Sequence, residues 1–146
     1  MIAPLPHPER TAALRRFYRE VDAVLVAGGR SCRGCGRCCR FDEAEHRLYA
    51  SRLERDYLLE SVAPFTPAEE GESEHSVELL AAGLRCPFQK EGRCLAREGR
   101  ALGCRLFFCS GLDDGLSEHW HQRLKHLHRD LGLEWDYAPL LPLRKR

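Results

Sequence analysis

The chain lacks a long hydrophobic run and an excess of charge of either sign. No stretch approaches the roughly 18–20 apolar residues of a membrane-spanning helix, and the start, MIAPLPHPERTAAL, has prolines and charges where a secretory signal needs an apolar run. Lysine and arginine number 23 against 22 aspartate and glutamate, which gives no electrostatic reason to expect nucleic acid or an anionic membrane as a partner. We therefore expect a cytoplasmic protein, whose thiols are kept reduced.

Motifs for several common activities are also missing. The sequence has no G-x-G-x-x-G and no Lys-Ser or Lys-Thr after a glycine run, so it shows no phosphate-binding loop. Its last helical segment holds His119, His121, His126 and His128, but no two of them have the i, i+4 spacing of a helical metal clamp. We expect these histidines to be surface or packing residues rather than ligands. Because no acid–base pair can be read from the sequence, a role without catalysis is preferred.

Cysteine is what the chain has in abundance, with eight among 146 residues. The pattern is C-x2-C-x2-C-C, a gap, and then C-x7-C-x9-C-x4-C. In a reducing compartment such a set favours metal over disulfides, and thiolates suit zinc, copper(I) and iron–sulfur clusters. The predicted ligands are Cys32, Cys35, Cys38, Cys39, Cys86, Cys94, Cys104 and Cys109.

The eight thiols can be divided in more than one way. Two successive C-x2-C steps put three thiolates on one loop, which is the spacing of a bacterial ferredoxin, and Cys86 precedes a proline as a remote fourth ferredoxin ligand does. Cys39 would belong to another metal atom, because the side chains of adjacent residues diverge. One possible partition is Cys32, Cys35, Cys38 and Cys86 in a first site, and Cys39, Cys94, Cys104 and Cys109 in a second. A single polynuclear centre remains an alternative, and the metal is zinc or iron, with a [4Fe–4S] cluster as one form of the latter.

Other residues near the cysteines could support such a site. Phe88, Phe107 and Phe108 lie beside cysteines and are expected to form an apolar wall around the metal. Seven arginines lie within two residues of a cysteine and could hydrogen-bond to sulfur, although an arginine-rich chain would place some there in any case. They are Arg30, Arg33, Arg37, Arg40, Arg85, Arg93 and Arg105.

The periodicity of apolar residues predicts mostly helix. A stripe at spacings of three and four indicates a helix over residues 10–27 that ends at a glycine pair, and Ser51 with Glu54 forms a capping box before a helix over about 52–61. An amphipathic helix is expected over about 117–131. Shorter helical pieces are expected at 95–103, at 76–82 and after a helix start at Thr66-Pro67.

Extended structure is expected only in short pieces. Residues 45–50 could form a short strand, and CPFQKEGRC suggests a tight turn at Glu91-Gly92 between two extended arms. Residues 1–9 are expected to be a loose lead-in. The fold class that follows is mainly α with short extended segments, as one small domain over residues 1–146 organised around a cysteine-rich metal centre, with a chelating core at 31–110. Trp120 and Trp135 are expected to be packing residues.

The pieces C-x2-C-x2-C-C, CPF…GRC and GCRLFFC together resemble the YkgJ-type cysteine-cluster family, over residues 31–110. The resemblance implies a zinc- or iron-chelating domain whose eight cysteines fall on the eight of this chain. One departure is Arg100-Ala101, where family members often have Arg-Pro. The family has no general reaction, and we find no signature here of the lysine methylation carried out by a related protein. Two other roles stay open: an iron–sulfur protein that supports redox or radical chemistry, and a thiol-based redox sensor.

Overall fold

The computed structural model describes residues 7–29, 48–61, 86, 88–90, 93–106 and 114–140. Within these ranges the protein is mainly helical, which confirms the predicted class. The helices are α1 (His7–Ala27), α3 (Arg52–Ser61), η2 (Arg97–Gly99), α5 (Leu102–Leu106) and α6 (Asp114–Asp130). The strands are β1 (Tyr49–Ala50), β2 (Gln89–Lys90), β3 (Arg93–Cys94) and β4 (Ala138–Pro139).

Helix α1 confirms the predicted N-terminal helix but begins three residues earlier, at His7. The expected loose lead-in was therefore wrong for residues 7–9, which form the first turn of the helix, while residues 1–6 lie outside the described residues. Pro8 lies in its first turn, where a missing N–H costs nothing, and Glu9 places a negative charge near the positive end of the helix dipole. At the other end Gly29 has a φ of 76° and terminates the helix. The predicted apolar stripe is the buried face, which consists of Leu14, Phe17, Val21 and Leu25 together with Tyr18.

Helix α3 begins with the predicted capping box. The backbone N–H of Glu54 donates to Oγ of Ser51 at 3.2 Å, and the backbone N–H of Ser51 donates to Oε2 of Glu54 at 3.0 Å. These two bonds satisfy donors that the first turn of a helix leaves without partners. Both residues are buried, with exposed fractions of 1% for Ser51 and 0% for Glu54.

Helix α6 confirms the predicted amphipathic helix and starts at Asp114, earlier than expected. It ends in a Schellman motif. The N–H of Leu133 donates to the His128 carbonyl at 2.8 Å, the N–H of Gly132 donates to the Arg129 carbonyl at 3.0 Å, and Gly132 has a φ of 72°. This turn reverses the chain, so that the following segment leads back to β4.

The strands form two small antiparallel pairs. β2 pairs with β3, with Gln89 opposite Cys94, which confirms the extended arms expected in CPFQKEGRC. β1 pairs with β4, with Tyr49 opposite Pro139. The strand expected at 45–50 is confirmed for its last two residues, whereas no signal in the sequence indicated β4. The helical pieces expected at 76–82 and after Thr66-Pro67 lie outside the described residues.

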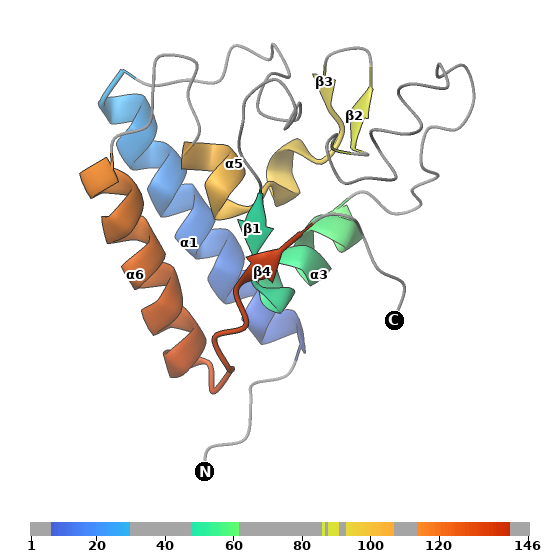
Figure 1. Cartoon of the computed structure of the whole chain (residues 1–146), viewed down its shortest axis with the longest axis vertical. Helices are drawn as coiled ribbons and strands as arrows, with labels where there is room; N and C mark the ends of the chain where they lie inside the picture. Colours follow the sequence, from blue (N-terminus) through green and yellow to red (C-terminus); the bar gives the residue numbers. More distant parts are fainter. Residues whose placement is uncertain are drawn as a thin grey trace.

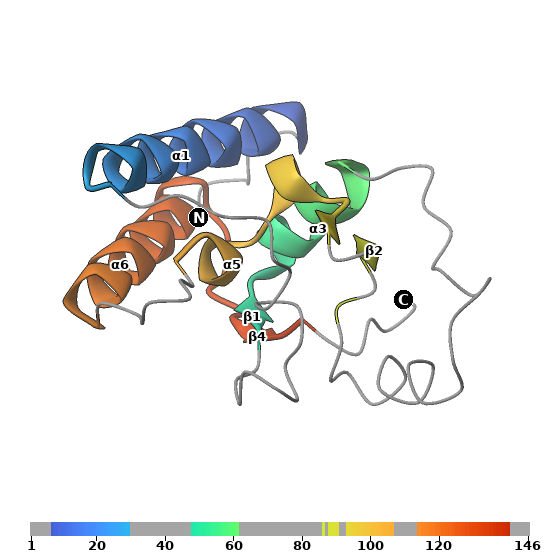
Figure 2. The same cartoon turned by 90° about the horizontal axis from the view of Figure 1, so that it is seen from above.

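Two hydrophobic clusters hold these elements together. The larger cluster lies between α1, α3, α5 and α6, and the predicted packing residue Trp120 is 2% exposed within it. The second cluster lies beside β1, β4 and the β2–β3 hairpin. Figures 1 and 2 show α1 and α6 on one side of the molecule and the hairpin on the other, with α3 and α5 between them. Among the described helices, none combines the length and the apolar character that a bilayer crossing requires.

Candidate metal centre

Three of the predicted ligands fall in the described ranges, and they share one cluster. Cys86 is buried, with 8% of its surface exposed, and carries a free thiol. Cys94 and Cys104 are half-buried and pack against the same second cluster. The ring of Phe88 is fully buried in this cluster, whereas Phe107 and Phe108 lie outside the described residues. The other five predicted ligands, Cys32, Cys35, Cys38, Cys39 and Cys109, lie outside the described residues.

The three thiols reach this cluster from separate pieces of chain. Cys86 precedes β2 and Cys94 ends β3, so the two residues belong to opposite arms of the hairpin. A further bond, from the N–H of Leu95 to the Phe88 carbonyl at 2.7 Å, continues the ladder toward Cys86. Cys104 comes from α5. The described residues contain no group of three histidine, cysteine or acidic side chains placed to hold a metal, so the three described thiols do not complete a site by themselves.

The N-terminus of α5 is held by a buried carboxylate. The backbone N–H of Leu102 donates to Oε1 of Glu54 at 2.8 Å, and the hydroxyl of Tyr18 donates to the same oxygen at 2.9 Å. Glu54 therefore joins α1, the start of α3 and the start of α5 at one fully buried point. A negative charge at this end of α5 also agrees with the sign of the helix dipole.

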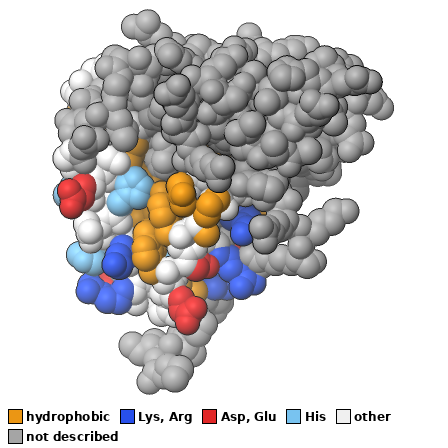
Figure 3. Space-filling view, viewed as in Figure 1, with side chains coloured by type: hydrophobic (Ala, Val, Ile, Leu, Met, Phe, Trp, Pro, Cys, Tyr) orange, Lys and Arg blue, Asp and Glu red, His pale blue; other side chains and the backbone are white. Residues whose placement is uncertain are grey.

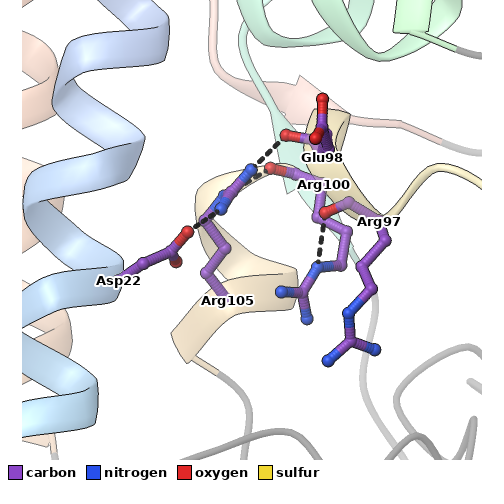
Figure 4. Close-up of polar contacts among 5 residues, drawn as sticks. All are labelled: Asp22, Arg97, Glu98, Arg100 and Arg105. Atoms are coloured by element: carbon purple, nitrogen blue, oxygen red, sulfur yellow. Dashed lines mark hydrogen bonds and ion pairs between the residues drawn. The ribbon is translucent and has the colours of Figure 1, made fainter.

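The other end of α5 is held by Arg105, which is 5% exposed. Its Nη1 donates to Oδ2 of Asp22 on α1 at 2.6 Å, its Nε donates to the Arg100 carbonyl at 2.9 Å, and its Nη2 donates to the Glu98 carbonyl. Figure 4 shows the guanidinium between Asp22 on α1 and the backbone of Glu98 and Arg100. The guanidinium carbon also lies 4.0 Å from the centroid of the Tyr18 ring, a favourable cation–π geometry.

These contacts give Arg105 a different role from the one expected. Each of its three nitrogens donates to an oxygen acceptor, so it anchors α5 and does not need sulfur as a partner. Cys104 lies between Leu102 and Arg105, the two residues that are tied down. Its backbone position is therefore set by polar contacts as well as by packing.

The charge of Cys104 is one of the causes that raise the pKa of two tyrosines, Tyr18 and Tyr137. Burial is the main cause that raises the pKa of Tyr18 well above its usual value, followed by the negative charge of Glu54, and the charge of a Cys104 thiolate adds to the effect. Burial likewise raises the pKa of Tyr137, with Glu54 and then Cys104 as further causes. The sulfur of Cys104 is thus within electrostatic reach of both phenols, which are expected to stay protonated beside it.

The four histidines of α6 differ in their surroundings, and Nε2 of His128 is a buried nitrogen without a hydrogen-bond partner among the described residues. Nδ1 of His128 lies 2.9 Å from the Leu124 carbonyl, and this side chain is 1% exposed. His121 contacts Ser117 and Tyr137. His119 packs edge-on against Trp120, at 5.2 Å between ring centroids, and His126 is exposed. These positions agree with the expectation of surface and packing residues.

Sequence reasoning missed the polar residues that position α5. The capping-box pattern pointed to Glu54, but as a local helix start rather than as a junction of three helices. Asp22 carried no signal at all, because its partner Arg105 lies 83 residues away along the chain. Comparison with known proteins adds no further guide, since no protein family, no curated protein and no solved structure matches this chain.

Proposed function

We propose that this chain is a metal-binding protein that chelates zinc or iron through cysteine thiolates, with a [4Fe–4S] cluster as one form of the iron. The observation that supports the proposal is that three thiols, from both arms of a hairpin and from α5, lie in or against one apolar cluster. The ligand set comprises Cys32, Cys35, Cys38, Cys39, Cys86, Cys94, Cys104 and Cys109.

A competing explanation is that these cysteines are merely small core residues, because buried cysteine commonly packs as a hydrophobe. Cys86 alone would fit that description. Cys94 and Cys104, however, are only half-buried and lie at the margin of the cluster. A thiol at the margin of a cluster keeps one side of its sulfur accessible, as a metal ligand requires. The polar anchoring of α5 also favours a ligand role, since metal sites rely on surrounding contacts to orient their ligands.

The arrangement bears on how the thiols are divided. In the two-site partition Cys86 belongs to the first site, whereas Cys94 and Cys104 belong to the second. All three pack against the same cluster, which favours one polynuclear centre, or two sites that lie close together, over two well-separated ones. Each cysteine that binds iron or zinc there would be deprotonated to the thiolate, because binding requires deprotonated sulfur.

The first experiment is metal analysis and absorption spectroscopy of full-length protein purified without oxygen. About four irons per chain with broad sulfur-to-iron charge-transfer absorption would identify a cluster, and about one or two zincs in a colourless protein would identify a zinc site. Reversible oxidation accompanied by metal release would favour the redox sensor. Absence of metal, with all eight thiols titratable or with four disulfides, would contradict chelation.

A pair of variants separates ligand loss from simple destabilisation. Cys104→Ser removes a half-buried thiol from α5 with little change in volume, and we expect it to lower the metal content or to change the absorption spectrum. Leu106→Ala is the control, because Leu106 is 1% exposed on the same helix but has no ligand atom. The control should lower thermal stability while keeping the metal content of the folded fraction. Equal metal content together with an unchanged absorption spectrum in Cys104→Ser would remove Cys104 from the ligand set.

A further inference from the structure

Tyr137 and His121 form a hydrogen-bonded pair whose proton positions can be deduced. Oη of Tyr137 lies 2.9 Å from Nε2 of His121, and Nδ1 of the same ring lies 2.7 Å from the Ser117 carbonyl oxygen, one helical turn earlier. A carbonyl can only accept a hydrogen bond, so Nδ1 must carry the hydrogen. In the neutral ring Nε2 then presents its lone pair, and the phenol of Tyr137 is the donor. The imidazole is thus placed to take the phenolic proton.

The ring of Tyr137 lies within a stack of aromatic side chains. Trp135 stacks on it at 5.0 Å between centroids with an interplanar angle of 4°, and Tyr49 lies 5.9 Å away at 24°. Tyr49 is 42% exposed and therefore connects the stack with solvent. Figure 3 shows hydrophobic side chains gathered on this face, over β4 and the segment that leads into it. Stacked rings allow a charge on one ring to be stabilised by its neighbours.

The other two tyrosines of the chain are less accessible to an external oxidant, since Tyr18 is 2% and Tyr57 is 7% exposed. The hydroxyl of Tyr18 does have a base beside it, the carboxylate of Glu54, so it is burial and the nearby guanidinium that set this ring apart. The guanidinium of Arg105 lies 4.0 Å from the ring centroid of Tyr18, and that of Arg15 lies 6.0 Å from the centroid of Tyr57. A positive charge over a ring opposes the removal of an electron from it. Tyr137 is flanked instead by electron-rich Trp135 and Tyr49, and its hydrogen-bond acceptor is Nε2 of His121.

We propose that Tyr137 and His121 form a one-electron donor site, at which the phenol reduces a one-electron oxidant while its proton moves to the imidazole. The oxidant is a free radical or an oxidised metal complex. One electron leaves the Tyr137 ring for the oxidant, and the Oη proton transfers to Nε2 of His121. The products are a neutral tyrosyl radical, an imidazolium that still donates from Nδ1 to Ser117, and the oxidant reduced by one electron. A one-electron reductant such as a thiolate reverses the change, and the proton then returns to Oη.

The surroundings of Tyr137 keep the phenol protonated until the electron leaves. Burial, with smaller contributions from the charges of Glu54 and Cys104, raises the pKa of the phenol above its ordinary value. The phenol is therefore in its protonated form at neutral pH, and the imidazole of His121 is the acceptor placed to take the proton on oxidation. This site uses no cysteine, so it stands independently of the proposed chelation.

Flash photolysis tests the proposal, with full-length protein and photogenerated ruthenium(III) tris-bipyridine as the oxidant. The parent should give a neutral tyrosyl radical, detected by electron paramagnetic resonance after rapid freezing and followed in solution by its absorption. Tyr137→Phe, which keeps the ring stack, should lose most of the tyrosyl signal although three other tyrosines remain. Tyr49→Phe is the matched control and should keep the signal.

His121→Gln tests the proton acceptor separately. Glutamine can still accept a hydrogen bond but is not a base, so tyrosyl formation should slow by about 10²-fold, the usual scale for loss of a positioned base. The parent rate should also fall in D₂O. An undiminished tyrosyl signal in Tyr137→Phe, or the same rate in His121→Gln as in the parent, would overturn the proposal. If Tyr137→Phe fails to fold by circular dichroism, His121→Gln decides alone, because it leaves all three stacked rings in place. Metal content is measured in parallel, so failure here remains distinct from failure of chelation.

Discussion

The buried carboxylate of Glu54 offers the sharpest test of how this fold is held together. It is 0% exposed, and it accepts hydrogen bonds from the Tyr18 hydroxyl, the Leu102 N–H and the Ser51 N–H at 2.9, 2.8 and 3.0 Å. The substitution Glu54→Gln keeps the shape of the side chain but turns one acceptor oxygen into an NH₂ donor. The remaining oxygen keeps its bonds to Tyr18 and Leu102. The new NH₂ group then faces the Ser51 N–H, and because both groups are hydrogen-bond donors, the Ser51 N–H loses its acceptor.

The expected cost follows from these contacts. A buried N–H left without an acceptor costs about 1–3 kcal/mol, and hydrogen bonds to a charged acceptor are worth about 1 kcal/mol more than neutral ones. Removal of the buried charge gives back part of its desolvation free energy. We expect a net loss of about 2–4 kcal/mol in the free energy of unfolding, which for a chain of this size corresponds to roughly 6–15 °C in melting temperature.

Urea unfolding followed by circular dichroism measures this loss, under identical metal and reducing conditions for every variant. Ser51→Ala is the matched control, because it removes the capping hydroxyl while leaving Glu54 with all three of its donors. That change should cost only about 1 kcal/mol. If Glu54→Gln costs no more than Ser51→Ala at an unchanged m-value, the carboxylate is not the junction between α1, α3 and α5 that the structure indicates.

Three further predictions concern other parts of the fold. Because burial raises the pKa of Tyr18 and Tyr137 in the folded state, their contribution to stability is complete below the unfolded value of about 10 and decreases as the pH rises above it. Unfolding measured from pH 9 to 11 should show this decline, and Tyr18→Phe should make it shallower; an unchanged slope would contradict the buried position of that phenol. Gly99→Ala should destabilise by about 1–3 kcal/mol, because its Cβ would lie 2.1 Å from a serine hydroxyl and 3.0 Å from backbone of α3. Gly103→Ala, which meets only a flexible leucine methyl at 2.9 Å, should cost less in the same thermal melt, and the reverse order would refute the packing of η2 on α3. Arg105→Lys should lower the urea midpoint by an amount equivalent to about 1–3 kcal/mol, since an ammonium cannot make the same fork of three contacts; an unchanged midpoint would show that the three contacts contribute nothing.

Local signals in the sequence were enough for α1, α3, α6 and the hairpin, but not for α5, which lies mostly beyond the helical piece expected at 95–103. The stripe of Leu14, Phe17, Val21 and Leu25 marked the buried face of α1, because a period near 3.6 places such residues on one side. Ser51 and Glu54 marked the start of α3, since the capping box joins residues only three positions apart. The arms of CPFQKEGRC pair across a turn of a few residues. Each of these features depends on neighbours in the chain, so it can be deduced without knowledge of the fold.

The cysteine pattern similarly indicated a kind of chemistry, but it did not place the thiols relative to one another. That Cys86, Cys94 and Cys104 pack against one cluster depends on how the hairpin and α5 meet. The five remaining cysteines lie outside the described residues, so chelation and its partition between sites stay predictions.

Contacts between distant segments were decided only in the tertiary structure. Arg105 reaches Asp22 across 83 residues, Glu54 binds the N–H of Leu102 across 48, and β1 pairs with β4 although β4 has no strand signal of its own. The sequence related Arg105 only to its neighbouring cysteines and Glu54 only to a local helix cap, and an isolated charged side chain is costly to bury. Burial becomes favourable only when the packed helices bring specific partners within hydrogen-bonding distance. The residue types and their local spacing therefore indicated the three long helices, the hairpin and the cysteine pattern. Packing decided which charged side chains, such as Arg105 and Glu54, are buried and hold the helices together.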